Sequence, residues 1–211
     1  KGINITIVDV NRKKIEKWNG PINNLPVKEP GLDQIIKKVR NKNLFFSTNI
    51  KNSIQESQMI FIAVNTPTAE SGPAKGMGAD LTNVIKTANE IAKFADTPKI
   101  VVEKSTLPVR TAEKLKEILE KNGKTSFDII SNPEFLAEGT AIKDLFKSDR
   151  VLIGGEETTR GRKATKHLIN IYSKWIPKNR ILLTNVWSSE LSKLASNAML
   201  AQRISSINSL S

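Results

Sequence analysis

Strand-like and helix-like stretches alternate along nearly the whole chain. Residues 59–64 form an apolar run that is typical of a strand buried on both faces of a parallel sheet. Residues 32–39 instead place their apolar side chains on one face of a helix. Because right-handed βαβ crossovers produce this alternation, the sequence predicts an α/β fold with a doubly wound parallel sheet. Further strands are expected at 3–8, 44–46, 99–103, 127–130, 151–153 and 181–183, and further helices at 12–18, 53–56, 81–94, 109–121, 160–172 and 188–211.

The composition is that of a globular protein. With 38% hydrophobic and 26% charged residues, the 211 residues suit one large domain, or one domain plus part of another. No apolar run approaches the roughly 20 residues of a membrane span, and no signal-peptide pattern opens the chain, so we expect a cytoplasmic protein. The chain has no cysteine, which excludes a disulfide framework, a Cys-ligated metal and a thiol nucleophile within it. No metal site is expected.

Basic residues outnumber acidic ones, 33 to 21, which gives a formal net charge of +12. Such a balance is typical of a nucleic-acid-binding protein, or of a protein with a basic surface and an anionic small substrate. The lysines are dispersed at spacings expected of solvated helix faces, without interleaved aromatic residues. A solvated basic surface is therefore favoured, and neither a nucleic-acid nor a membrane partner is expected.

Two glutamates, Glu134 and Glu138, follow the predicted strand at 127–130. Open α/β sheets build their sites beyond the carboxyl ends of their strands, so Glu134 at the strand tip is a candidate for chemistry. Pro133 ends the strand, and Glu138 begins the next turn and faces elsewhere, so the two acids can have different roles. The alternative is that they are surface residues that complement a helix dipole.

Other polar residues also stand at predicted strand ends. Asp9 follows the first strand, where a dinucleotide-binding fold places the acid that accepts both ribose hydroxyls and repels a 2′-phosphate, which favours NAD over NADP. Ser105 and Thr106 follow the strand at 99–103. Asp9 and Thr106 have an alternative role as helix caps. The turn after the strand at 59–64 exposes amides and hydroxyls that suit a phosphate or nicotinamide-ribose groove, and consists of Val64, Asn65, Thr66, Pro67 and Thr68.

Lys193 and Asn197 lie four residues apart on the last predicted helix and therefore project from the same face. Apolar residues cover other parts of the circumference of this helix. The pair thus forms a polar stripe against which a substrate can lie, and the alternative is a solvated helix face.

The chain resembles the UDP-glucose 6-dehydrogenase family, and most closely its animal members, in a series of segments that follow the family's order. The segments are VDVN (8–11), EPGL (29–32), VNTPT (64–68), EKSTLPVR (103–110), SNPEFLAEGTA (131–141), RVLIGG (150–155) and WSSELSKL (187–194). The resemblance implies a Rossmann-like domain that begins after the family's first strand and Gly-rich turn and ends before its nucleophilic cysteine. It also implies an incomplete NAD-binding domain at 1–186, followed by the start of a long connecting helix at 187–211.

The resemblance implies roles for individual residues. Thr106 and Glu134 would handle the water that hydrolyses a thioester, and Lys193 and Asn197 would stabilise the developing alkoxide at C6 of the sugar. Lys14 stands where the family often has an arginine, so a planar guanidinium is replaced by a compact ammonium. The implied cofactor contacts are Asp9, Lys14, Val64, Asn65, Thr66, Pro67, Thr68, Ser105 and Glu138. The implied substrate contacts are Glu134, Phe135, Leu136, Ala137, Glu138, Lys193 and Asn197.

The implied reaction is the oxidation of the C6 alcohol of UDP-glucose to the carboxylate of UDP-glucuronate by two NAD, in a homo-oligomer. We expect this chain alone to be inactive, because it lacks a thiol. Three alternatives stay open. They are a non-catalytic regulatory or decoy subunit of such an enzyme, a relative that acts on GDP-mannose or UDP-N-acetylmannosamine, and a basic nucleic-acid-binding module.

Overall fold

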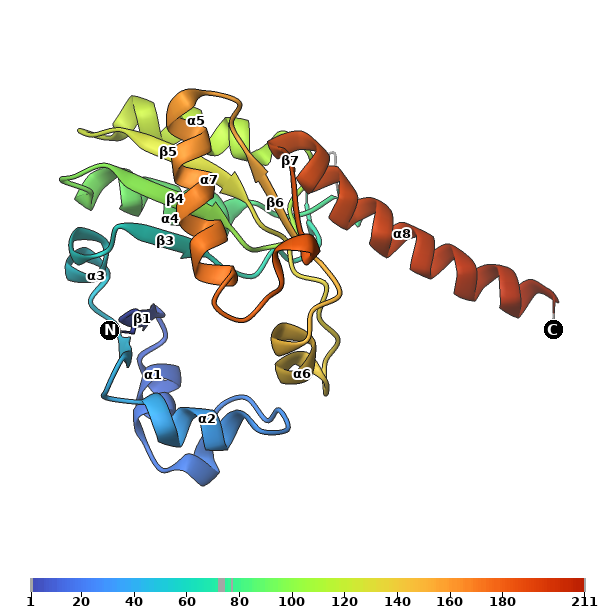
Figure 1. The fold of residues 1–211 in the computed structure, drawn as a ribbon, viewed down its shortest axis with the longest axis horizontal. Helices are drawn as coiled ribbons and strands as arrows, with labels where there is room; N and C mark the ends of the chain where they lie inside the picture. Colours follow the sequence, from blue (N-terminus) through green and yellow to red (C-terminus); the bar gives the residue numbers. More distant parts are fainter. Residues whose placement is uncertain (1, 72–74, 77, 211) are drawn as a thin grey trace. The chain divides into compact units, whose positions relative to one another are not determined.

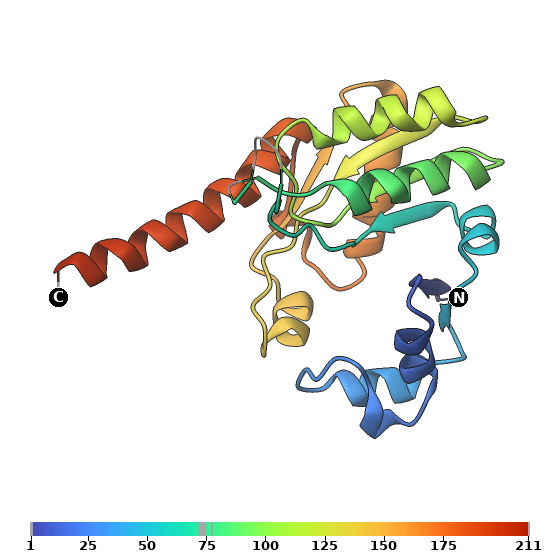
Figure 2. The same ribbon diagram turned by 180° about the vertical axis from the view of Figure 1, so that it is seen from behind.

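The computed structural model describes residues 2–71, 75–76 and 78–210, and Figures 1 and 2 draw the fold from two sides. The chain divides into two compact units. Unit 1 consists of Lys1–Ser57 and Leu136–Ser148, and unit 2 of Gln58–Phe135 and Asp149–Ser211. Each unit has its own sheet.

Unit 1 is built on two parallel strands, β1 and β2, with short helices around them. Its core joins Ile15, Leu25, Ile36 and Phe46, and Trp18 stacks on Phe46 with ring centroids 5.0 Å apart. The elements of this unit are β1 (Ile5–Val8), α1 (Arg12–Asn19), a 3-10 turn (Ile22–Asn24), α2 (Leu32–Val39), β2 (Leu44–Ser47), α3 (Ile50–Glu56) and α6 (Ala141–Phe146).

Glu29 ties the distant segment 136–148 to the rest of unit 1. Its carboxylate accepts hydrogen bonds from the backbone N–H groups of Gly139, at 3.0 Å, and Ala141, at 2.7 Å. An acid at the start of a helix satisfies amides that lack partners within the helix, and α6 begins at Ala141. The EPGL segment therefore has a structural role that the sequence pattern did not indicate.

Unit 2 is a five-stranded sheet with helices on both faces. Helices α4 and α5 lie on one face and α7 lies on the other, as the two views of Figures 1 and 2 show. Val102, Ile130, Ile153 and Leu168 are fully buried in the core between α7 and the sheet. The strands, in spatial order, are β3 (Met59–Ile62), β4 (Lys99–Glu103), β5 (Phe127–Ser131), β6 (Val151–Gly155) and β7 (Ile181–Asn185). The helices are α4 (Thr82–Phe94), α5 (Thr111–Asn122), α7 (Thr159–Tyr172), a 3-10 turn (Lys178–Arg180) and α8 (Val186–Leu210).

The expected α/β fold with parallel strands is confirmed, but the expectation of a wholly parallel sheet is wrong at one pair. Strands β5 and β6 are antiparallel, with Ile130 opposite Gly155, whereas the other neighbours in this sheet are parallel. A parallel neighbour needs a crossover that returns to the opposite end of the sheet. The connection from β5 to β6 carries only α6, which belongs to unit 1, so β6 starts at the end of the sheet where β5 stops.

Most of the predicted elements are present, with ends shifted by a few residues. Asn11 caps α1, because its side-chain oxygen accepts a hydrogen bond from the Lys14 N–H at 3.1 Å. Helix α3 begins at Ile50 rather than at residue 53. Helix α6 was not predicted, because its six residues are too few to show a helical period.

The first half of α8 packs closely on the sheet. A side chain at Gly154 would overlap the Ser189 side chain, so the two elements meet only because position 154 is glycine. The Ser189 hydroxyl donates a hydrogen bond to the Ser131 carbonyl at 3.3 Å. One residue later, the Glu190 carboxylate accepts hydrogen bonds from the N–H groups of Arg110, at 2.8 Å, and Ala112, at 2.9 Å. These contacts attach α8 to β5, β6 and the start of α5.

The second half of α8 is exposed from Asn197 to Ser209 and extends away from the sheet of unit 2 (Figure 1). Its apolar residues, among them Met199, Ile204 and Ile207, face solvent. Among the described residues, no helix has the length and apolar character needed to span a membrane. All of α8 belongs to unit 2. The division of the chain into two domains after residue 186 stays a prediction.

The Glu103 carboxylate is buried near Glu190, the residue that attaches α8 to the start of α5. Glu103, at the end of β4, is 1% exposed, and neither of its carboxylate oxygens has a hydrogen-bond partner among the described residues. Burial raises the pKa of Glu103 well above its ordinary value, and the neighbouring Glu190 carboxylate raises it further. A buried polar group without a partner costs free energy, so Glu103 lowers stability wherever it must ionise.

We predict that Glu103→Gln stabilises the chain at pH 8 and has little effect at pH 4. The pKa of Glu103 is higher in the folded chain than its unfolded value of 4.5, so its favourable contribution is complete below 4.5 and is lost as the pH rises. Glutamine does not titrate and keeps the shape of the side chain. Urea unfolding should therefore give a higher free energy of unfolding for the variant at pH 8, because only the glutamate loses stability when its buried carboxyl group resists ionisation.

The control is Glu117→Gln, which removes an exposed carboxylate from α5. Its difference from the parent chain should be small and the same at both pH values. An equal difference at pH 4 and pH 8 for Glu103→Gln would show that Glu103 does not titrate abnormally.

Candidate functional site at the strand ends of unit 2

Three loops leave the carboxyl ends of β3, β4 and β5, which are neighbouring parallel strands. Because these strands run in the same direction, the three loops emerge at one edge of the sheet. The loops hold residues 63–68, 104–108 and 132–135, which include most of the site residues predicted in unit 2.

Side-chain hydroxyls join the first two loops. The Ser105 hydroxyl donates to the Val64 carbonyl at 2.7 Å, and the Thr66 hydroxyl donates to the Thr106 carbonyl at 3.2 Å. The Asn83 side chain, on α4, donates to the Asn65 carbonyl at 3.3 Å. The predicted cofactor turn, Val64–Thr68, therefore lies directly beside Ser105 and Thr106, although about 40 residues separate the two loops in the sequence.

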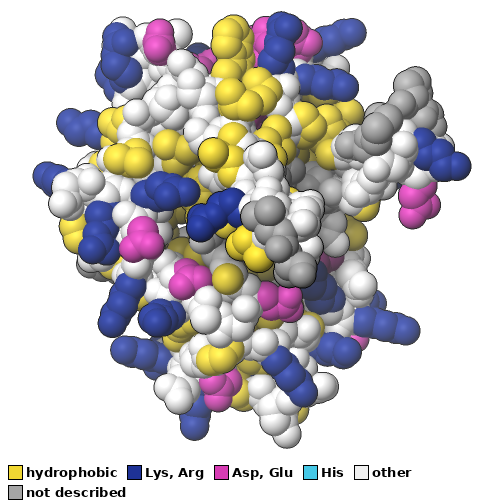
Figure 3. Space-filling view, turned by 90° about the vertical axis from the view of Figure 1, so that its right-hand side faces the viewer, with side chains coloured by type: hydrophobic (Ala, Val, Ile, Leu, Met, Phe, Trp, Pro, Cys, Tyr) yellow, Lys and Arg dark blue, Asp and Glu magenta, His cyan; other side chains and the backbone are white. Residues whose placement is uncertain are grey.

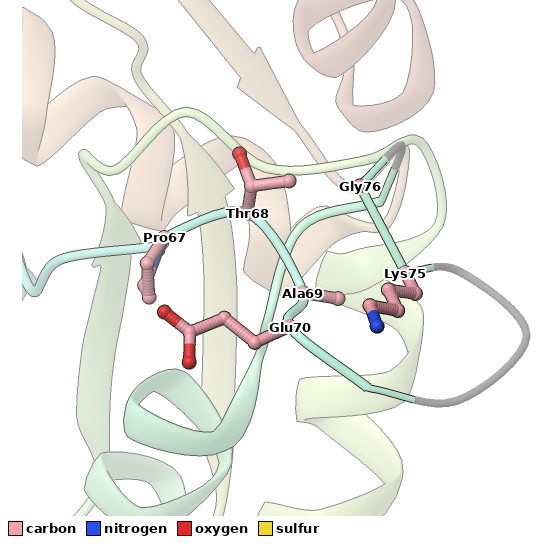
Figure 4. Close-up of a pocket in the computed structure, with 6 residues that line it drawn as sticks. All are labelled: Pro67, Thr68, Ala69, Glu70, Lys75 and Gly76. Carbon is pink, nitrogen blue, oxygen red and sulfur yellow. The ribbon is translucent and has the colours of Figure 1, made fainter.

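A shallow hollow of about 420 Å³ opens beyond the 64–68 turn (Figure 4). Among the described residues, it is lined by Pro67, Thr68, Ala69, Glu70, Lys75 and Gly76. Two of these, Pro67 and Thr68, were predicted as cofactor contacts. The predicted catalytic residues are not part of this lining, so the hollow does not enclose them.

Glu134 and Lys193 meet next to the third loop. The Lys193 ammonium lies 3.6 Å from the Glu134 carboxylate, and the side chains are 10% and 31% exposed. Since only part of the carboxylate is covered, water can still reach it. Phe135 lies under two cations, with the Arg150 guanidinium 4.5 Å and the Lys193 ammonium 5.3 Å from its ring centroid. Two of the predicted catalytic residues are thus in contact.

A buried hydrogen-bond network centres on Asn132, two residues before Glu134. Asn132 is completely buried, and its side-chain N–H group donates to the Leu152 carbonyl at 2.8 Å. Its side-chain oxygen accepts from the Tyr172 hydroxyl at 2.7 Å and from the Lys104 ammonium at 3.4 Å. Burial raises the pKa of Tyr172 to about 12, so the hydroxyl keeps its proton and stays a donor.

The remaining predicted substrate contacts are arranged differently. Asn197 lies one turn beyond Lys193 on α8 but is exposed, whereas Lys193 is buried. Leu136, Ala137 and Glu138 belong to unit 1 and are exposed. The Ala137 N–H donates to the Asp144 carboxylate at 3.1 Å, within that unit. The structure of unit 2 therefore brings together Glu134, Phe135 and Lys193 from the predicted substrate set.

Asp9 and Lys14 form an ion pair of 2.8 Å in unit 1. The other Asp9 oxygen accepts the Asn11 N–H at 2.9 Å. Partial burial acts to raise the pKa of Asp9, but the hydrogen bonds from Lys14 and Asn11 outweigh burial and lower it. Asp9 is therefore a carboxylate at the end of β1, as predicted, and Lys14 neutralises part of its charge.

Sequence reasoning missed Lys104, Asn132, Tyr172 and Glu190. Lys104 and Asn132 stand within conspicuous segments, but a lysine and an asparagine at strand ends are usually solvated. The burial of Asn132 depends on Tyr172, 40 residues further along the chain, and Lys104 reaches the same Asn132 oxygen. The one available signal was position, since Lys104 and Asn132 are each the first residue after a strand of the same edge.

Basic side chains do not gather in one patch on the face drawn in Figure 3. Lysine and arginine are scattered there among acidic, apolar and neutral residues. Among the described residues, no group of three or more His, Cys, Asp or Glu has an arrangement suited to a metal ion.

Comparison with known proteins gives the same family by sequence and by structure. The model of the "UDP-glucose/GDP-mannose dehydrogenase family, NAD binding domain" matches residues 1–176. UDP-glucose 6-dehydrogenase of Drosophila melanogaster is 60% identical over 209 residues, which cover 98% of this chain. The UDP-glucose dehydrogenase of Pyrobaculum islandicum has a TM-score of 0.85 and 30% identity, covering 97% of this chain and 46% of its own. The GDP-mannose dehydrogenase of Pseudomonas aeruginosa has a TM-score of 0.86 and 27% identity, covering 98% and 47%.

The chain spans 44% of the length of the Drosophila enzyme. The matched region contains the strand ends that carry Asp9, Ser105, Thr106 and Glu134. The chain belongs to the UDP-glucose/GDP-mannose dehydrogenase family and carries its NAD-binding domain.

Proposed function

We propose that this chain forms the NAD-binding part of a UDP-glucose 6-dehydrogenase, which oxidises the C6 alcohol of UDP-glucose to a carboxylate with two NAD. The observation that carries the proposal is the contact between Lys193 and Glu134, at 3.6 Å, at the edge of the sheet where Ser105 and Thr106 also lie. A cation and a partly exposed acid together suit a reaction that develops negative charge and then consumes water. The 60% identity to the Drosophila enzyme supports the choice of substrate.

The described residues fit NAD. Asp9 follows β1, and its carboxylate keeps acceptor capacity for ribose hydroxyls beside its bonds to the Asn11 N–H and the Lys14 ammonium. The exposed Asn65, Pro67 and Thr68 offer polar groups and a shallow surface beside Ser105. When bound, NAD accepts the hydride that leaves the substrate carbon. The proposed NAD contacts are Asp9, Lys14 and Glu138 in unit 1, and the 64–68 turn and Ser105 in unit 2.

The residues of α8 act on the developing charge. In our proposal, the Lys193 ammonium stabilises the alkoxide that forms as the C6 hydroxyl loses its proton, and the Asn197 amide donates to the same oxygen. A charge fixed in a buried position stabilises the transition state without rearranging, and Lys193 is only 8% exposed. Glu134 keeps Lys193 in place while no substrate is present.

Glu134 and Thr106 are proposed to handle the hydrolytic water. Glu134 accepts a proton from this water, and Thr106, fixed through its carbonyl by Thr66, orients it. The other proposed substrate contacts are Phe135 in unit 2 and Leu136, Ala137 and Glu138 in unit 1. The chain has no cysteine and so does not supply the thiol that this reaction requires.

The finer assignments are also proposals. We infer that the isolated chain does not turn over UDP-glucose, and that the intact enzyme is a cytoplasmic homo-oligomer, to which the exposed apolar residues of α8 are suited. A regulatory or decoy subunit is the second candidate, because this chain holds the water-handling and charge-stabilising groups but no thiol. A substrate such as GDP-mannose is the third, supported by the TM-score of 0.86 with the Pseudomonas aeruginosa enzyme.

We predict that a chimaera in which this chain replaces the 209 aligned residues of the Drosophila enzyme produces NADH from UDP-glucose. Its kcat/KM for UDP-glucose should exceed that for GDP-mannose by about 10²-fold or more, the range expected when the site's hydrogen bonds match only one sugar. NADH formation by the chimaera, the parent enzyme and the 211-residue chain alone is measured under the same conditions.

The chain alone should give no UDP-glucose-dependent NADH. Sustained NADH formation by the isolated chain would refute the inference that the chain needs a thiol from elsewhere in the enzyme. A chimaera that melts like the parent enzyme but prefers another nucleotide sugar would refute the substrate assignment.

We predict that the chimaera prefers NAD to NADP and that Asp9→Asn weakens this preference. The carboxylate repels a 2′-phosphate, and the amide does not. Lys14→Met should strengthen the preference, because it removes the cation that partly neutralises Asp9 at 2.8 Å. Calorimetric titration with both cofactors measures the ratio of the Kd values. The exposed Lys13→Met is the matched control and should leave the ratio unchanged. Equal affinity of the unmodified chimaera for both cofactors would contradict the role of Asp9.

We predict that Lys193→Met in the chimaera lowers kcat and kcat/KM together by about 10²-fold or more, the usual loss for one preorganised charge stabiliser. Methionine keeps most of the buried volume of the side chain. The control Lys114→Met removes an exposed lysine of α5 and should leave both constants unchanged. An unchanged kcat for Lys193→Met would mean that the lysine only holds α8 in place.

A further inference from the structure

Lys104 is the first residue after β4, and its backbone is fixed by the neighbouring strand. Its N–H donates to the Ile62 carbonyl at 2.9 Å, which continues the pairing of β3 with β4. The side chain is partly buried, and its ammonium donates to the Asn132 side-chain oxygen at 3.4 Å. The Lys104 side chain therefore extends from the end of β4 to the buried Asn132 side chain.

The partner of this ammonium has only one orientation that satisfies its bonds. Asn132 gives its amide N–H to the Leu152 carbonyl at 2.8 Å and accepts the Tyr172 hydroxyl at 2.7 Å. If the amide were reversed, two donors would face each other at the Lys104 ammonium and two acceptors at the Leu152 carbonyl. The oxygen of Asn132 therefore faces Lys104, in a completely buried position.

Three charged groups share this region. Lys104 interacts electrostatically with Glu134, after β5, and with Lys193, on α8. Tyr172, on α7, reaches the same Asn132 oxygen. Burial lowers the pKa of Lys104 to about 8, the Lys193 charge lowers it as well, and the Glu134 carboxylate opposes both. The ammonium groups of Lys104 and Lys193 thus both act on one carboxylate, that of Glu134.

We propose that Lys104 is a further positioning residue of this site: its ammonium, held at the buried Asn132 oxygen two residues before Glu134, electrostatically supports the Glu134 carboxylate while Glu134 takes a proton from water. The inference rests on the proposed function, in which Glu134 serves the hydrolytic step. Lys104 acts only in its protonated form, because the neutral amine offers Glu134 no charge. Lys193 then remains available for the substrate oxygen, since Glu134 has a second cation.

The coupling is tested first in the 211-residue chain, without substrate or cofactor. The chain is labelled with an amine-selective anhydride across a range of pH, and peptide-resolved mass spectrometry gives a labelling midpoint for each lysine. The midpoint of Lys104 should lie near 8. It should fall by about one pH unit in Glu134→Gln and rise in Lys193→Met, as expected for charges a few ångström away.

Two matched variants control for loss of charge elsewhere. Glu117→Gln and Lys114→Met remove one exposed charge each from α5 and should leave the Lys104 midpoint unchanged. A Lys104 midpoint equal to those of exposed lysines, or one that moves equally in Glu117→Gln and Glu134→Gln, would overturn the proposal. This outcome does not depend on whether the proposed reaction is correct.

The role in the reaction is tested by pH profiles of the chimaera with the Drosophila enzyme. The kcat of the parent chimaera should fall as the pH rises through about 8, where Lys104 loses its proton. Lys104→Arg keeps a charge that does not titrate there, so the fall should move to higher pH. Lys104→Met should have a kcat lowered about tenfold or more, the low end of a lost charge-supporting contact, with no fall near pH 8.

An alkaline fall that is identical in the parent and in Lys104→Arg would overturn the role of Lys104 in the reaction, even if the labelling coupling is present. A Lys104→Met variant with a normal kcat would do the same. Thermal melts of all variants ensure that only folded proteins are compared.

Discussion

The Glu190 carboxylate fixes α8 to the start of α5, and the arrangement of the site depends on this contact. Its two oxygens accept the N–H groups of Arg110 and Ala112, which lie where the α5 dipole is positive. Arg110 is in the left-handed region, with φ 75°, and the bond to Glu190 helps to hold it there. Lys193 follows three residues later on the same helix. Because each residue turns a helix by about 100°, a slip of one residue would point Lys193 away from Glu134.

The polar groups near the strand ends are tolerated in the interior because nearly all of them are paired. Asn132 uses both ends of its amide, Tyr172 donates to it, and Lys193 contacts Glu134. Glu103 is the exception among the described residues of this region, since neither oxygen has a partner. The same burial that penalises Glu103 also lowers the proton affinity of Lys104, so one low-dielectric region has opposite effects on acids and bases.

The sequence predicted those parts of the structure that depend on local pattern. Alternating apolar runs located the strands, and the rule that sites lie at the carboxyl ends of parallel strands made Thr106 and Glu134 candidates. No local sequence pattern indicated that β6 is antiparallel to β5 or that residues 136–148 belong to unit 1. Both features depend on the path of the chain between β5 and β6. The sequence also did not indicate that Lys104 and Asn132 share a buried hydrogen-bond network. A single sequence does not show that Tyr172, 40 residues away, covers Asn132.

The distance in sequence between Glu190 and Arg110, 80 residues, has a consequence for how the protein forms during synthesis. Strands β3, β4 and β5 leave the ribosome early and can pair through short crossovers. The bond that positions α8 closes a much longer loop and becomes available only after residue 190 has emerged. Until then a nascent chain can already have its sheet and its loops, while Glu134 has no Lys193 beside it. Lys193 therefore joins Glu134 only after the sheet and its loops can form, so a shorter nascent chain carries Glu134 without the Lys193 ammonium beside it.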